Sequence, residues 1–390
     1  MKTGDLKRFL AALLAAVLAV CLPVSAMADE GHEKAKDAAV SYLKASIADK
    51  CPIVTYETEE PLLSVSSYTY ESALAALALM SEGEFADAAR ILDGFADGMK
   101  ADAEFNDRLR NAYMAGNAST LPGYWNNEQE QWVQDAYQVG TGTKSSCVAA
   151  VALLTYHKTI PNESYLNTAM TGINWILANC QDGTSGFTSG YTGWKNADAF
   201  TDLTYKSTSD NLWMAAACKM LADATGWSKY EEAASSARRF ATETMYSAGD
   251  SRFFQGTAED GATPVTNLVL TDVQALAELC LKNDSGMDNI AMCHTNEGGY
   301  SFDNSNTDGS WLEGTAIAAL ALKEIGETEK AGTALSVLEK DQLPSGSFPE
   351  ASVPELKTGE EDRIIRNLPS VAPCAWFILA VNDFNPFDGA

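Results

Sequence analysis

Six stretches of the chain are apolar on almost every side and rich in alanine. They cover residues 71–80, 145–154, 210–221, 272–281, 311–322 and 371–381. A helix that is apolar all round has to be buried within the protein, and small side chains let neighbouring helices approach closely. The pattern therefore predicts six buried helices.

A second kind of segment follows most of these stretches. In residues 84–100, Phe85, Leu92, Phe95 and Met99 recur at helical spacing with charged residues between them, as in an amphipathic helix. Similar segments cover residues 163–180, 228–246 and 328–342, and a shorter one covers 287–295. Residues 32–47 form another such segment, which lacks a buried partner of its own.

Pairing each buried segment with an amphipathic one gives six helical hairpins if residues 32–47 pair with the last buried segment. We therefore predict an all-α protein, an (α/α)6 toroid, in which residues 29–390 form a single domain. An open helical array is the alternative.

The connections between these helices are unequal in length. Turns from inner to outer helices are short, whereas the returns over 101–143, 181–207, 247–270, 295–310 and 342–369 are long and rich in aromatic residues. Long loops at one end of a rigid scaffold commonly build a functional site. Glycine-aromatic turns in three of them predict small β-hairpins at this end.

Residues 1–28 have the features of a signal peptide: Lys2, Lys7 and Arg8 precede an apolar run, and small residues lead to a cleavage site after Ala28. Residues 18–21 resemble a lipobox, but Val20 is bulky for that signal, so lipidation is the less favoured alternative. No later segment is long and apolar enough to span a bilayer. We expect a secreted or cell-envelope protein with no membrane association after cleavage.

Charge narrows the classes of partner. The formal charge is −26, and it becomes −28 without residues 1–28, which carry three basic residues and one acidic residue. Such a field repels nucleic acids and anionic membranes, so we expect neither as a partner. It also disfavours polyanionic glycans.

Cysteine usage gives no metal or redox motif. Removal of Cys21 with the signal leaves seven cysteines without a CxxC pair. Disulfides are permitted in an exported chain, and Cys280 with Cys293 is the pair to check. There is no zinc pattern.

Several segments together resemble a known superfamily. "YTYESALAALAL", "STSDNLWM", "WLEGTAIAALAL" and the closing "APCAWFILAVNDFNPF" are similar to segments of the six-hairpin glycosidase superfamily. The closing segment resembles that of a group of secreted bacterial proteins with this fold, many without an assigned activity. The resemblance implies the toroid, and it implies catalytic acids at the N-terminal ends of the inner helices.

Four carboxylates fall in the first turns of the buried segments: Glu71, Asp210, Asp272 and Glu313. If the long loops close over that end, all four point toward one cleft, where a pair of carboxyl groups can hydrolyse a glycoside. Capping is the competing explanation, because Ser310 with Glu313 and Ser207 with Asp210 fit capping boxes and the helix dipole favours acids there. Their recurrence at one end of a ring favours a site.

Aromatic and amide side chains near these acids suggest a groove for a neutral sugar. The candidate substrate-binding residues are Tyr68, Tyr70, Trp125, Trp194, Asn211 and Trp311. Any single one of these aromatic residues is also explained as an anchor that pins a loop to the ring.

Other chemistries are disfavoured. His157 and His294 fall near predicted helix ends away from the acids, which argues against a catalytic triad or a histidine-ligated metal. Residues 304–310 resemble a calcium loop, but Thr315 stands where the bidentate glutamate belongs. No phosphate or dinucleotide motif appears, and we expect no metal and no cofactor.

The sequence thus favours an exported, monomeric glycoside hydrolase that acts on a neutral oligo- or polysaccharide. Glu313 or Glu71 is the favoured proton donor and Asp210 or Asp272 the favoured base. A non-catalytic glycan-binding or surface-assembly protein is the alternative. A polysaccharide lyase ranks third. A lyase that acts on uronates needs cationic residues at the cleft, and few lie near the acids, Lys206 and Arg252 being the nearest in sequence.

Overall fold

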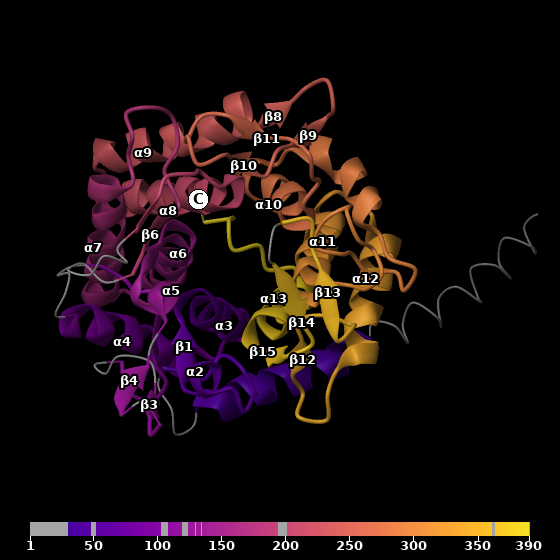
Figure 1. The fold of residues 1–390 in the computed structure, drawn as a ribbon, viewed down its shortest axis with the longest axis horizontal. Coiled ribbons are helices and arrows are strands. Elements are labelled where there is room, and N and C mark those ends of the chain that lie inside the picture. The colour runs from indigo at the N-terminus through magenta and orange to yellow at the C-terminus, as the bar shows by residue number, and fades with distance from the viewer. Residues whose placement is uncertain are drawn as a thin grey trace, which may run out of the picture.

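Six helices form a closed inner ring within the part of the chain that the computed structural model describes (Figure 1), which is residues 30–47, 52–102, 108–118, 124–128, 130–133, 135–193, 201–360 and 363–389. The inner helices are α3 (Thr69–Ser81), α6 (Thr143–Thr159), α8 (Thr208–Thr225), α10 (Thr271–Leu281), α11 (Leu312–Glu324) and α13 (Val371–Val381). Each packs against the next, and α13 packs against α3. The predicted (α/α)6 toroid is confirmed, and the open array is excluded.

An outer layer surrounds this ring. It consists of α4 (Phe85–Ala101), α7 (Glu163–Asn179), α9 (Ser228–Arg239), α12 (Thr328–Asp341), the 3-10 helix η2 (Asp284–Cys293) and the helix over residues 30–47. A π-helical turn, η1 (Phe240–Thr244), continues α9. The helix over 30–47 is joined to the end of the chain, because Lys36 Nζ donates to Asn382 Oδ1 at 3.0 Å. The first and last segments therefore meet, as the pattern predicted.

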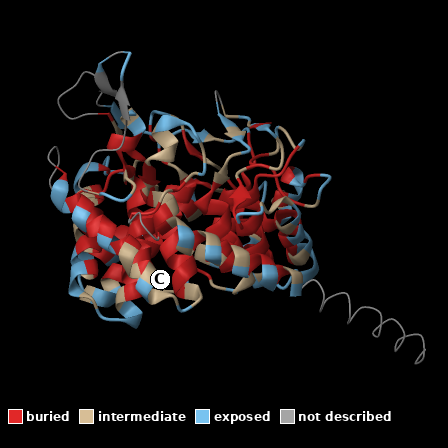
Figure 2. Cartoon of the chain, turned by 90° about the horizontal axis from the view of Figure 1, so that it is seen from below, coloured by how far each residue is buried: buried red, intermediate tan, exposed pale blue. Residues whose placement is uncertain are grey.

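Burial follows the predicted division between the two layers. Every residue from Ala73 to Leu79 in α3 is fully buried, and α13 is buried from Val371 to Ala380. In α4, by contrast, the buried residues include Ala88, Ile91, Leu92 and Phe95, which lie on one face. Seen edge-on, buried positions fill the interior and exposed positions lie around it (Figure 2).

A chain of backbone hydrogen bonds runs around the ring at the loop end. The first residue of each inner helix donates its N–H to a carbonyl in the loop that leads to the next inner helix. The donor and acceptor pairs are Thr69 with Asn111, Thr143 with Ser189, Thr208 with Gln255, Thr271 with Phe302, Leu312 with Glu350 and Val371 with Thr55. Helix starts and loops are therefore held in fixed register around the ring, because buried backbone donors need acceptors.

Short strands and two one-turn helices, α2 (Pro61–Ser64) and α5 (Ala136–Val139), lie in the loops at this end. The strands are β1 (Ser66–Tyr68), β2 (Ala112–Met114), β3 (Tyr124–Asn126), β4 (Gln131–Val133), β5 (Thr141–Gly142), β6 (Gly190–Thr192), β7 (Thr201–Leu203), β8 (Tyr246–Ser247), β9 (Arg252–Phe253), β10 (Gly256–Thr257), β11 (Pro264–Val265), β12 (Phe348–Pro349), β13 (Glu355–Lys357), β14 (Ile364–Arg366) and β15 (Pro369–Ser370). Their pairing is antiparallel: β1 with β2, β3 with β4, β5 with β6, β6 with β7, β8 with β9, β10 with β11, β12 with β15 and β13 with β14. Small β-elements at the loop end are therefore confirmed, but several pair segments from different loops.

The C-terminal segment covers the opposite end of the ring. Asn385 donates from Nδ2 to the carbonyl of Leu279 at 3.0 Å, and the Phe387 ring lies 4.3 Å from that of Trp213, centroid to centroid. Residues 382–389 thus run from α13 across to α8 and α10 (Figure 1). None of the described helices has the length and apolar character of a membrane span.

The described cysteines are all free thiols, so the expected Cys280–Cys293 disulfide is not formed. Cys280 Sγ donates to the carbonyl of Leu212 at 3.4 Å, and Cys293 Sγ donates to that of Val269 at 3.3 Å. Each thiol thus has its own backbone carbonyl as a partner, and burial raises the pKa of both thiols to about 12. Cys293 is buried and Cys280 is partly buried against the core, so both behave as small apolar packing residues.

Candidate active site

A cavity of about 1150 Å³ lies at the loop end of the ring. The second residues of five inner helices and the third residues of four of them line its floor: Tyr70, Glu71, Lys144, Ser145, Ser209, Asp210, Asp272, Val273 and Glu313. Above them lie loop residues whose carbonyls accept from the helix starts, namely Asn111, Ser189, Gln255, Phe302 and Glu350. The hydrogen-bonded register of the ring therefore places two tiers of side chains around one space.

All four predicted acids line this cavity. Glu71, Asp210, Asp272 and Glu313 come from α3, α8, α10 and α11, so their helix starts converge as the sequence pattern indicated. Each is buried or partly buried, with Glu313 exposed by 7% and Asp210 by 8%. Four carboxylates from four separate helices thus share one enclosed space.

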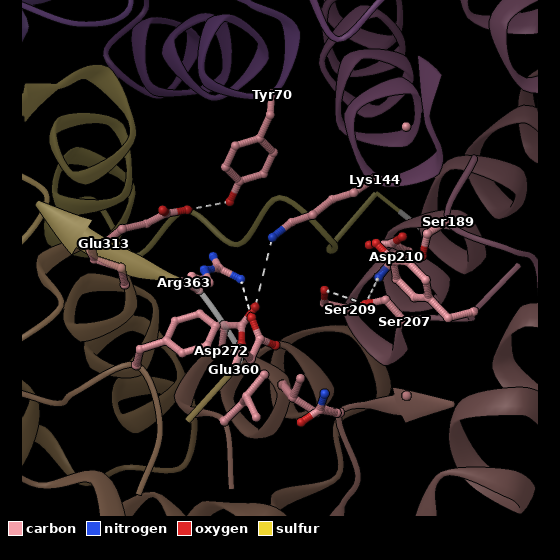
Figure 3. A pocket seen from close by; sticks show the side chains of 18 of the residues that line it. Tyr70, Lys144, Ser189, Ser207, Ser209, Asp210, Asp272, Glu313, Glu360 and Arg363 are labelled. Carbon is pink, nitrogen blue, oxygen red and sulfur yellow. Dashed lines mark hydrogen bonds and ion pairs between the residues drawn. The ribbon is translucent and has the colours of Figure 1, made fainter. Parts of the chain in front are cut away.

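Three glutamates form one side of the cavity, the glutamate group: Glu71, Glu313 and Glu350. The Tyr70 hydroxyl donates to Glu313 Oε1 at 2.5 Å (Figure 3), and the Tyr56 hydroxyl donates to Glu71 Oε1 at 3.4 Å. Ser370 Oγ donates to Glu350 Oε1. Each glutamate is therefore oriented by one hydroxyl donor.

The glutamate group has raised pKa values. Burial, reinforced by the charges of Glu313 and Glu71, raises the pKa of Glu350 to about 8. Burial likewise raises the pKa of Glu71 to about 7, with a further contribution from Glu313 and opposition from Lys144. The pKa of Glu313 is also raised by burial, against the effects of Lys144 and the Tyr70 hydroxyl. A cluster of carboxyls that share protons near neutral pH is typical of acid–base sites.

Two aspartates lie on the other side, the aspartate pair: Asp210 and Asp272. Asp272 forms an ion pair with Lys144, with 3.9 Å between Oδ2 and Nζ (Figure 3). Burial raises the pKa of Asp210, although Ser189, Lys144 and Ser207 act in the opposite direction. The Lys144 ammonium, which also lies 4.6 Å from the centroid of the Tyr70 ring, therefore stands between the two sets of carboxyls.

The two predicted capping boxes have different outcomes. Ser207 caps α8, because its hydroxyl accepts from the N–H of Asp210 at 3.4 Å. The N-cap of α11 is Trp311 and has no side-chain cap, while the Ser310 hydroxyl is hydrogen bonded to that of Thr295. The capping box at Ser310 and Glu313 was therefore wrong, and the Glu313 carboxylate is hydrogen bonded to Tyr70 instead.

Three of the predicted aromatic residues line the cavity: Tyr68, Tyr70 and Trp311. Trp311 also packs against Phe302, with ring centroids 5.0 Å apart, so it supports the loop as well. Trp194 lies outside the described residues, and the side chain of Trp125 in β3 is likewise outside the described part. The structure therefore places three of the six predicted sugar-binding residues in the cavity lining.

Asn211 does not line the cavity. Its side-chain oxygen accepts from the N–H of Phe187 at 2.8 Å, and its Nδ2 donates to the carbonyls of Phe187 and Ser207. Gln274 in α10 holds Phe253 in the same way. Both are the fourth residue of an inner helix, one position beyond those that face the cavity. The prediction that Asn211 contacts a sugar is not supported, and its role is to fix a loop.

Sequence reasoning missed Glu350, Lys144 and Arg363, which all line the cavity. Lys144 was detectable, because it is the second residue of α6, equivalent to Asp272 in α10. Glu350 and Arg363 lie in the loop before α13, and the segment that contains Arg363 has no helical pattern that would place it. Lys206 and Arg252, the cations nearest the acids in sequence, have other partners. Lys206 forms an ion pair with Asp182 at 2.8 Å, and Arg252 donates to the carbonyl of Thr266.

Histidine and metal chemistry find no support among the described residues. His32, His157 and His294 do not line the cavity, and His157 is hydrogen bonded to Asn162. No group of three or more potential metal-ligating side chains is found in the described part of the chain. In the calcium-like loop, Asn304 and Asn306 use their side-chain oxygens to accept from backbone N–H groups.

Solved structures with the same fold include enzymes that act on sugars. A glycosidase variant with a glutamate replaced by alanine has a TM-score of 0.66 and 11% identity, over 92% of this chain and 98% of that one. An alpha-amylase from Clostridium perfringens has a TM-score of 0.63 and 11% identity over 90% and 98% of the two chains. A cellobiose 2-epimerase from Bacillus thermoamylovorans has 0.60 and 11% over 84% and 92%. No family model and no curated protein matches the sequence.

Proposed function

We propose that this protein is an exported glycoside hydrolase that acts on a neutral oligo- or polysaccharide by carboxylate acid–base catalysis. The observation that carries the proposal is the shared cavity of the glutamate group and the aspartate pair. Glycoside hydrolysis needs one carboxyl group that keeps its proton at working pH and one that is ionised. The similarity in fold to glycosidases, one of them determined with glucose, supports the same activity class.

The glutamate group is the source of the proton donor in this mechanism. Glu313 is the best placed, because its carboxyl lies in the floor of the cavity and is held by the Tyr70 hydroxyl. Burial and the charge of Glu313 raise the pKa of Glu350 to about 8, so Glu350 retains its proton at neutral pH. Asp272, beside the Lys144 ammonium, is the favoured base or nucleophile on the opposite side.

Rings around the cavity are suited to hold a sugar. Tyr68, Tyr70 and Trp311 line the cavity, and Tyr137 and Tyr205 line it with exposed side chains. Apolar faces of pyranose rings pack on aromatic rings, and the hydroxyls then hydrogen bond to nearby polar groups. An uncharged glycan suits this lining, since carboxylates outnumber cations there.

Product release from a panel of neutral glycans by the purified protein tests the proposal. New reducing ends from at least one glycan would support the hydrolase. Binding without turnover across the panel would contradict it and leave the glycan-binding alternative. A lyase would instead leave a product with a double bond conjugated to its carboxylate. An increase in ultraviolet absorbance that occurs only with uronate polymers would therefore indicate a lyase.

A sugar epimerase is the second candidate, because epimerases share the fold. General acid–base catalysis is most often performed by histidine, and no histidine lines the described cavity. The same panel separates the two activities. An epimerase converts a reducing disaccharide to an isomer of equal mass, whereas a hydrolase releases monosaccharides.

The alkaline limb of the pH–rate profile is expected above the ordinary titration range of a glutamate, because burial raises the pKa of Glu313, the favoured donor, and raises those of Glu71 and Glu350 to about 7 and about 8. A proton donor with a raised pKa is competent below that value and is lost as the pH rises through it. We therefore expect kcat to fall about tenfold for each further pH unit, as measured on the best substrate of the panel. A rate that stays constant to pH 9 would exclude this group as the donor.

A further inference from the structure

Lys144 is the one cation on the cavity floor formed by the described first turns of the inner helices. It is the second residue of α6, the position that carries Tyr70 in α3, Asp272 in α10 and Glu313 in α11. Its ammonium lies 3.9 Å from Asp272 Oδ2 and 4.6 Å from the centroid of the Tyr70 ring. In Figure 3 the side chain extends between Glu313 with Tyr70 on one side and Asp210 on the other.

The ammonium makes no hydrogen bond within the described part of the chain. Its distance to Asp272 exceeds a hydrogen bond, and the tyrosine ring offers its face rather than an acceptor atom. Most other cavity cations are matched by a close partner: Arg363 binds Glu360 at 2.8 Å, Arg366 binds Glu60 at 3.0 Å and Lys206 binds Asp182. Lys144 therefore acts on the cavity as a point charge rather than as half of a tight pair.

We propose that Lys144 is a positioning residue whose ammonium pairs with the Asp272 carboxylate opposite the glutamate group, so that one cavity contains both a base held by a cation and an acid. The catalytic role that this inference gives to Lys144 rests on the proposed function. The electrostatic part of the inference concerns the protein without substrate and stands independently.

The charged groups that face Lys144 come from four neighbouring elements and the loop above. They are Glu71 with Tyr70 from α3, Asp210 from α8, Asp272 from α10, Glu313 from α11, and Arg363 above Glu313. Lys144 lowers the pKa of Glu71, of Asp210 and of Glu313 against the effect of burial. Without it, the carboxyls of the cavity floor would be left with Arg363, Arg366 and Lys206, which are already bound to Glu360, Glu60 and Asp182.

Replacing Lys144 by Met removes the charge and keeps an unbranched side chain. A nearby positive charge favours the ionised form of a carboxyl, so its loss raises the pKa of Glu71, Asp210 and Glu313. We expect the carboxyl titration of the substrate-free protein, followed by carbon-13 NMR of labelled Asp and Glu, to move toward higher pH. In the active protein, the alkaline limb of the pH–rate profile moves to higher pH, and Lys144→Arg restores it.

Lys158→Met is the matched control, because Lys158 lies exposed in the last turn of the same helix. It removes one positive charge from α6 and should leave both measurements unchanged. Unchanged titration in Lys144→Met would overturn the inference. If the titration shifts while the wild-type protein turns over no glycan, the electrostatic inference stands and the proposed hydrolase activity fails. A lower kcat with an unmoved pH profile would assign Lys144 a structural role only.

Discussion

Replacing Glu313 by Gln is expected to lower kcat by about 10²- to 10⁴-fold on any glycan that the wild-type protein cleaves. The substitution keeps the shape of the side chain, and the Tyr70 hydroxyl can still donate to the amide oxygen. What is lost is the exchangeable proton of a buried carboxyl in the cavity floor, since Glu313 is exposed by only 7%. Binding of the glycan should change little, so the loss should appear in kcat and not in KM.

Glu329→Gln is the control for this measurement. Glu329 also lies in the first turn of a helix, α12, but it is exposed and belongs to the outer layer. Its replacement should leave kcat within about twofold, because it removes a comparable helix-dipole contact without touching the cavity. If Glu313→Gln retained full turnover, Glu313 would not be the donor, and Glu350→Gln would become the next variant to measure.

The ring was predictable from sequence because its layers have different patterns. An inner helix such as α11 has neighbours on every side, so its residues from Leu312 to Leu322 are all buried and the apolar run is continuous. An outer helix such as α4 has solvent on one side and shows helical spacing instead. Two outer segments depart in kind: η2 winds as a 3-10 helix where an amphipathic segment was predicted over 287–295, and the segment predicted over 228–246 ends in the π-helical turn η1.

The floor of the cavity was predictable, and its upper tier was not. Residues at one end of a buried helix must converge when six such helices close a ring, which is why Glu71, Asp210, Asp272 and Glu313 could be grouped. Glu350 reaches the cavity because its carbonyl accepts from the N–H of Leu312, 38 residues earlier in the chain. No local pattern encodes that pairing.

The sequence prediction selected residues by type, as carboxylates and amides, rather than by their position in the inner helices. Lys144 occupies the same position as Asp272, yet a search for carboxylates passes over it. Asn211 lies one residue after Asp210, but a turn of about 100° per residue directs its side chain to the loop rather than to the cavity. A prediction that treated the first four residues of each inner helix by position would have separated these roles.

Replacing Trp376 by Ala is expected to lower the free energy of unfolding by about 3–5 kcal/mol. Trp376 is fully buried in α13, the helix that closes the ring against α3, and its ring centroid lies 6.2 Å from that of Trp213 across the ring interior. Its removal leaves a cavity between helices that are held by packing. Urea unfolding followed by circular dichroism measures the loss.

Two further variants separate packing from the effect on the active site. Trp227→Ala makes the same change at a side chain that is 49% exposed between α8 and α9, and it should cost about 0.5 kcal/mol or less. Trp376→Phe keeps most of the bulk but loses the indole N–H, which donates to the Tyr70 hydroxyl at 3.3 Å. Because that hydroxyl holds Glu313, we expect Trp376→Phe to affect kcat more than stability. A near-zero cost for Trp376→Ala would mean that α13 does not close the ring, and the convergence of helix starts that builds the cavity would lose its basis.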